Sequence, residues 1–229
     1  MTYKSDEEIK REVLRELRWD TRVDETEVGV IVHKGIVTLT GWVDCYAKKL
    51  AAQEAAHRVH GVCDVANEID VKLSGDLVRT DADIAKTLRR VFEWNVLVPA
   101  ERIHSTVSDG WVTLSGTVDY LSEREDAERA VRHLAGVKGV TNQLVVAEQE
   151  IEPEEVRSII EAALERRADR AAQRIKVTVV EGAVTLSGVV RNWAEKRALI
   201  GAVSHAPGVH TVHDHLRIDP YQVAAAHGR

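Results

Sequence analysis

The 229-residue sequence has no long hydrophobic run. A membrane-spanning helix needs about 18 consecutive apolar residues, and no stretch approaches that length. The N-terminus is charged from Lys4 to Glu8 and lacks the apolar core of a signal peptide. We therefore expect a cytoplasmic protein without a transmembrane segment.

Cysteine and positive charge are also scarce. Cys45 and Cys63 allow at most one disulfide and lack the paired spacing of a zinc site, so we interpret both as reduced thiols. The 31 basic residues are outnumbered by 37 acidic ones, and the net charge is -6. Nonspecific nucleic-acid binding needs clustered cations, so we expect no nucleic-acid partner. The 44% hydrophobic content still predicts a folded chain.

One segment occurs three times. Gly35-Ile-Val-Thr-Leu-Thr-Gly returns from Gly110 and again from Gly182, with periods of 75 and 72 residues. A Gly-Val pair follows each copy at a constant distance, so the repeat is a whole structural unit. We predict three domains at residues 4–74, 79–148 and 151–220. Nine glycines keep their place in the repeat and are interpreted as structural: Gly35, Gly41, Gly61, Gly110, Gly116, Gly136, Gly182, Gly188 and Gly208.

Each unit begins with a helix signal. Ser5 and Thr80 are each followed three residues later by an acidic residue, which is typical of a capping box, and Pro153 suits a first helical position. Two alternating strands then flank a polar-Gly pair, which indicates a hairpin. A helix with a stripe of small residues and a third alternating strand complete the unit. The class is α+β, with three tandem αββαβ units, each a three-stranded mixed sheet with two helices on one face.

A glycine interrupts the second strand of every hairpin, at Gly41, Gly116 and Gly188. A glycine within a strand often marks the close approach of another backbone. We expect a helix to pack directly over these three positions.

These residues together resemble the BON domain (bacterial OsmY and nodulation). The resemblance rests on Gly-x-Val-Thr-Leu-[Ser/Thr]-Gly-x-Val, the helix starting Trp193-Ala-Glu-Lys-Arg-Ala, the Gly-Val turn and a final Asn-x-[Ile/Leu]-x-Val strand, and it covers nearly the whole chain. It implies the αββαβ fold and a non-enzymatic module that attaches proteins to phospholipid membranes, found in osmotic-stress and envelope proteins. Some cytosolic relatives are linked to potassium sensing.

The polar residues do not form a persuasive catalytic or metal site. No nucleophile has an adjacent base, and the glycine motif lacks the Lys-[Ser/Thr] ending of a phosphate loop. His210, His213 and His215 could hold a transition metal, but strand alternation places His213 and His215 on the open face of the sheet. We favour a solvated polar face there, no cofactor and no enzymatic activity.

A candidate binding surface lies at the start of each second helix. Tyr46, Leu121 and Trp193 share this position, and Lys196 and Arg197 follow Trp193. An exposed ring beside cations suits a lipid headgroup region or a partner protein. The alternative is that the ring covers the sheet edge or the next unit. Residues 150–229 hold eleven basic and eleven acidic residues, whereas the first two units are acidic, so anionic lipid would favour the third unit.

Three functions follow in order of preference. The first is a stress-related, non-enzymatic protein that binds phospholipid surfaces or partner proteins. The second is a sensor that binds potassium or another small ion, and the third is a structural assembly module. A melting temperature that differs between potassium and sodium would favour the sensor.

Overall fold

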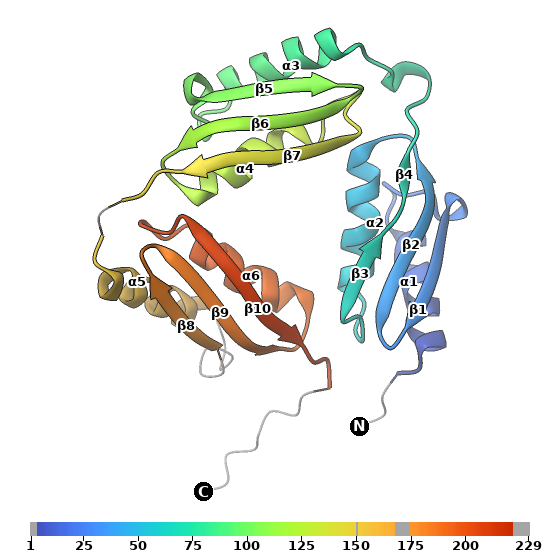
Figure 1. The fold of residues 1–229 in the computed structure, drawn as a ribbon. Coiled ribbons are helices and arrows are strands. Elements are labelled where there is room, and N and C mark those ends of the chain that lie inside the picture. Colours follow the sequence, from blue (N-terminus) through green and yellow to red (C-terminus); the bar gives the residue numbers. More distant parts are fainter. Residues whose placement is uncertain (1–3, 150, 168–174, 222–229) are drawn as a thin grey trace, which may run out of the picture.

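The computed structural model describes residues 4–149, 151–167 and 175–221, with the side chains of 164–167 left out, and shows three similar units (Figure 1). Unit one contains α1 (Asp6–Trp19), β1 (Val28–His33), β2 (Ile36–Val43), α2 (Tyr46–Arg58), β3 (Asp64–Asn67) and β4 (Asp70–Val71). Unit two contains α3 (Asp81–Trp94), β5 (Ile103–Ser108), β6 (Trp111–Val118), α4 (Leu121–Val131) and β7 (Gly139–Val146). Unit three contains α5 (Pro153–Arg167), β8 (Ile175–Val180), β9 (Ala183–Val190), α6 (Trp193–Ser204) and β10 (Thr211–Ile218). Three short 3-10 turns are also present: η1 (Glu25–Glu27), η2 (Gly75–Leu77) and η3 (Ala100–Arg102).

Each unit has its own mixed sheet. The hairpin strands pair antiparallel, and the third strand pairs parallel with the second strand of the hairpin. The predicted αββαβ order is therefore confirmed. Unit one differs in that its third strand is broken between Asn67 and Asp70 into β3 and β4, where one continuous strand was expected. Both pieces pair with β2 in one register, Leu39 with Asn67 and Trp42 with Asp70, so the break leaves the faces unchanged.

The helix starts form as the sequence predicts. The Ser5 hydroxyl accepts a hydrogen bond from the Glu8 amide (3.3 Å), and the Glu8 carboxylate accepts one from the Ser5 amide (2.8 Å). Thr80 and Asp83 form the same capping box, and Pro153 is the first residue of α5. Each box satisfies amides that have no partner within the helix.

The tight hairpin turns are tied to the first helices. In unit one, Lys34 and Gly35 both adopt positive φ, at 51° and 75°, as a two-residue turn of type I′ requires. The Asp6 carboxylate, at the start of α1, accepts hydrogen bonds from the amides of Lys34 (2.8 Å) and Gly35 (3.0 Å). These bonds lower the pKa of Asp6. Asp81 makes the same pair of bonds in unit two.

The prediction of a helix over the strand glycines is wrong. At Gly41 and Gly116, an added Cβ would collide with the backbone carbonyl oxygens of Glu27 and Arg102, just before the first strand of the same hairpin. Gly188 shares their positive φ. These glycines therefore allow a close backbone approach within the hairpin itself. The first helix instead approaches the glycine of each Gly-Val turn, in the pairs Ile9–Gly61, Ile84–Gly136 and Val156–Gly208.

The units are arranged in a ring, with α2, α4 and α6 toward its centre (Figure 1). The buried cores of units two and three merge into one apolar cluster, whereas unit one has a separate core. Unit three returns to unit one at the chain ends, where the Tyr221 hydroxyl accepts a hydrogen bond from the Lys4 amide (2.8 Å). We call the unit one–two, two–three and three–one contacts the first, second and third junctions.

Candidate binding surface

The predicted surface at the start of the second helices lies at the junctions. Trp193 stacks on His57 of α2, with ring centroids 3.8 Å apart and planes 19° from parallel. Tyr46 packs against the shared core of units two and three, and Leu121 is buried in that core. Leu121 is therefore buried, and Tyr46 and Trp193 are half-buried, so the three side chains do not form an open surface. The ring contacts the neighbouring unit, which was the alternative interpretation.

These contacts repeat around the ring. His57, Arg132 and Ser204 are equivalent residues near the ends of the second helices. Trp193 meets His57 at the third junction, and the Ser204 hydroxyl donates to the Glu125 carboxylate (2.8 Å) at the second. At the first junction, burial and then the charge of Glu128 raise the pKa of Tyr46, while Arg132 acts in the opposite direction. The start of one second helix thus meets the end of another.

Lys196 is engaged within unit three. Its ammonium lies 2.7 Å from the Asp214 carboxylate, donates to the Leu216 carbonyl (3.0 Å) and sits 5.1 Å from the centre of the Trp193 ring. Asp214 also accepts a hydrogen bond from the Leu216 amide (3.0 Å). Because this cation is paired and largely covered, its role is structural. Arg197, by contrast, is exposed, and its role in binding stays a prediction.

His57 is held neutral at the third junction. Burial, and then the charge of Arg197, lower its pKa to about 4, while Asp64 acts in the opposite direction. Its Nε2 and the Trp193 Nε1 are both buried without a hydrogen-bond partner. A proton on His57 would therefore add an unpaired charge to a closed contact.

The histidines of unit three do not converge. His210 contacts the Glu181 carbonyl (2.5 Å) and the Thr211 hydroxyl (3.1 Å), whereas His213 and His215 are exposed on β10. Within the described residues, no three His, Cys, Asp or Glu side chains are grouped as a metal ion would need.

Among the described residues, the strongest exposed apolar feature is formed by the last residue of α3 and the loop that follows it, and we call residues 94–97 the Trp94 loop. Trp94 is 87% exposed, Val96 97% and Leu97 59%. Single exposed apolar residues are ordinary, but three within four residues form an exposed apolar patch. This surface was not predicted from the sequence.

The Trp94 loop is firmly anchored to unit two. Phe92 before it and Val98 after it are buried in the core. The Asn95 side chain accepts a hydrogen bond from the Leu97 amide (3.1 Å), and Arg89 of α3 donates to the Ala100 carbonyl (2.9 Å). The exposed side chains are thus presented on a backbone fixed at both ends.

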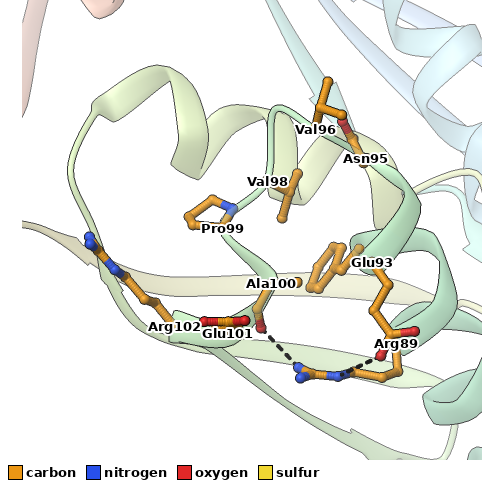
Figure 2. Close-up of a pocket in the computed structure, with 10 residues that line it drawn as sticks. Arg89, Glu93, Asn95, Val96, Val98, Pro99, Ala100, Glu101 and Arg102 are labelled. Atoms are coloured by element: carbon orange, nitrogen blue, oxygen red, sulfur yellow. Dashed lines mark hydrogen bonds and ion pairs between the residues drawn. The ribbon is translucent and has the colours of Figure 1, made fainter.

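A cavity of about 500 Å³ lies beside this loop (Figure 2). Val96, Val98 and Pro99 supply apolar walls, and Arg89, which is paired with Glu93 (3.4 Å), lines the other side. The surface therefore combines exposed apolar side chains with a guanidinium and a hollow.

Unit one carries a related feature. Trp19 ends α1 as Trp94 ends α3, and it is 78% exposed. The two tryptophans lie 75 residues apart, which is the repeat period. This coincidence was visible in the sequence and could have identified the surface.

The comparisons with known proteins agree with the fold. The model of the BON domain matches residues 5–72, 80–148 and 154–220. The chain is 30% identical over 131 residues to osmotically-inducible protein Y of Escherichia coli (strain K12), covering 53% of this chain and 63% of that protein, less than two thirds of its length. It is 32% identical over 118 residues to an uncharacterized protein in the gshII 5′ region of Anaplasma centrale, covering 49% and 78%.

Among solved structures, CdsD, a structural protein of the type III secretion system of Chlamydia trachomatis, matches 93% of this chain and 92% of its own. Its identity is 13% and its TM-score 0.27, so this match says nothing about the arrangement of the units. No helix in the described part of this chain is long and apolar enough to cross a membrane. The three matches of the domain model cover most of the sequence, and the chain belongs to the BON domain family.

Proposed function

We propose that this chain is a non-enzymatic, stress-related protein that attaches to phospholipid surfaces through the Trp94 loop. The supporting observation is the near-complete exposure of Trp94 and Val96 on an anchored loop. Tryptophan favours the boundary between headgroups and acyl chains because its ring is apolar and its N–H is polar. The stress association rests on the relative named for osmotic induction.

The expected attachment is weak and reversible. Burying a large apolar side chain contributes about 1.5–3 kcal/mol, so Trp94, Val96 and Leu97 together give on the order of 5 kcal/mol. That corresponds to a dissociation constant of roughly 0.1–1 mM. If Trp19 reaches the same surface, the second contact raises the avidity.

Charge opposes rather than drives this attachment. The net charge of -6 is repelled by an anionic membrane, and the neutral third unit was the expected contact on electrostatic grounds. The apolar exposure instead favours unit two. Binding driven by apolar insertion should be largely insensitive to salt, because screening acts on charges.

Cosedimentation with vesicles tests the proposal. We expect binding to neutral phosphatidylcholine vesicles that persists at high salt. A matched variant, Trp94→Ser with Val96→Ser, should leave the protein in the supernatant. Absence of binding by the wild type would overturn the membrane function and leave a partner protein as the ligand of the loop.

A further inference from the structure

The three junctions are built from equivalent parts of the repeat. In each, the end of the third strand of one unit approaches the Gly-Val turn of the next. At the third junction, for example, the charge of Asp219 helps burial to raise the pKa of Cys63, two residues after Gly61. We call the space between the end of the third strand of one unit and the Gly-Val turn of the next unit a crevice. Each of the three junctions has one.

A side chain enters two of the three crevices. At the second junction, the Gln149 side chain accepts a hydrogen bond from the Gly208 amide (3.2 Å) and donates to the Asp119 carbonyl (3.0 Å). At the third, the Tyr221 hydroxyl lies beside Gly61. Gln149 and Tyr221 are equivalent residues, 72 positions apart.

The first crevice is open. Ser74 stands at the position of Gln149 and Tyr221. The connection from Ser74 to α3 is three residues longer than the connection from Gln149 to α5, and it forms η2. A cavity of about 550 Å³ remains between the end of the third strand of unit one and the turns at Gly110 and Gly136 of unit two, and Ser74 does not line it. This volume is within the range of small-molecule sites.

The open crevice is also the cationic one. Three repeat positions can be compared at each junction, one just after the third strand and two on the next unit. In the first junction all three are basic, in the second none carries a fixed charge, and in the third acidic and basic residues are mixed. The sets are Lys72, Arg79 and Lys138, then Ala147, Ile151 and His210, then Asp219, Lys4 and Cys63.

The acidic residues on the same wall are already engaged. Both oxygens of Asp81 accept hydrogen bonds from the hairpin amides of Asp109 (2.8 Å) and Gly110 (2.9 Å). Asp109 pairs with Lys138 at 2.9 Å, but its side chain is 88% exposed, so this pair is weak. Arg79 donates to the carbonyls of Asp76 and Val78, which holds its guanidinium on the cavity wall.

From this comparison we propose that the first junction binds a small phosphorylated molecule. Lys72, Arg79 and Lys138 receive the phosphate, since clustered cations and a guanidinium fork suit its charge and oxygens. Val71, Leu73 and Val78 face the organic part. The ligand occupies the place that Gln149 and Tyr221 fill elsewhere and so links unit one to unit two. This site is separate from the Trp94 loop.

Titration calorimetry and thermal melting of the full chain test this site, with glycerol 3-phosphate as the soluble probe and chloride at equal ionic strength as the reference. We expect saturable binding and a higher melting temperature with the probe. Arg79→Gln and Lys138→Gln should each weaken binding about tenfold or more. Lys86→Gln, an exposed cation of α3 outside the cavity, is the matched control and should bind as the wild type does.

Each outcome decides the proposal. The proposal is overturned if the wild type does not bind the probe, or if the Arg79 and Lys138 variants bind it equally well. The exception is a loss of binding to phosphatidylglycerol vesicles in those variants alone, which would assign the phosphate to a lipid headgroup. The melting temperature without probe shows whether the variants fold. The Trp94→Ser variant should keep full binding of glycerol 3-phosphate, so failure of the membrane proposal would leave this one standing.

Discussion

Trp193 and Trp94 show how position in the fold decides what a tryptophan does. Trp193 begins a second helix and stacks on His57 of another unit, whereas Trp94 ends a first helix and is 87% exposed. Both are single tryptophans near cations in the sequence. The second helices lie toward the centre of the three units, so the Trp193 side chain forms a contact within the protein. The Trp94 side chain is exposed and is therefore available to a partner.

The largest expected effect separates the two residues by membrane affinity. Trp94→Ser should lower the affinity for phosphatidylcholine vesicles about tenfold or more, because a fully buried aromatic side chain contributes about 1.5–3 kcal/mol. Trp193→Ala should leave that affinity unchanged. Cosedimentation over a range of lipid concentrations measures both. Loss of binding in the Trp193 variant alone would return the surface to the second helices.

Stability should show the reverse pattern. Removing a buried tryptophan costs about 3–5 kcal/mol, and the half-buried Trp193 should cost roughly half of that as Trp193→Ala. Trp94→Ser should change the free energy of unfolding by less than about 0.5 kcal/mol, as exposed positions do. Urea denaturation measures both values. Equal losses would contradict the assignment of Trp193 to a junction.

Acid should weaken the third junction through His57. Its pKa is lowered from 6.5 to about 4, so the folded state favours the neutral ring. The part of the folding stability that depends on a neutral His57 is fully present above pH 6.5 and is lost as the pH falls from there toward 4. His57→Phe keeps a ring against Trp193 but cannot be protonated. The difference in stability between wild type and variant should therefore shrink or reverse over this window, and a constant difference would contradict the neutral assignment.

The smallest effect concerns the chain ends. Tyr221→Phe removes the hydroxyl that accepts from the Lys4 amide but keeps the ring that meets His60 edge-on at 5.6 Å. The expected loss is about 0.5–1.5 kcal/mol of unfolding free energy. A loss of several kcal/mol in urea denaturation would show that the third junction depends more on the Tyr221 hydroxyl than on its aromatic contacts.

Local features of the fold were predictable because neighbouring residues determine them. The capping boxes at Ser5 and Thr80 and the hairpin turns need only a few adjacent side chains and amides. The Asn67 side chain likewise accepts a hydrogen bond from the Ile69 amide (3.3 Å), only two residues away. Repetition of these signals was sufficient to predict three units.

Features that depend on packing between segments were not predictable in the same way. A glycine in a strand signals a close approach but not its partner, which at Gly41 is the Glu27 carbonyl rather than a helix. Whether Trp193 is exposed depends on the position of unit one, because His57 of that unit covers the Trp193 ring. The local sequence around Trp193 does not specify that position. The Trp94 loop was the exception, since its match to Trp19 was present in the repeat.

The most direct test of the membrane account is depth-dependent quenching. One variant keeps only Trp94 and another only Trp193, with the remaining tryptophans replaced by Phe, and each is mixed with phosphatidylcholine vesicles that carry brominated acyl chains. We predict strong quenching of Trp94 fluorescence and none of Trp193. Unquenched Trp94 on vesicle-bound protein, or quenching confined to Trp193, would contradict the account.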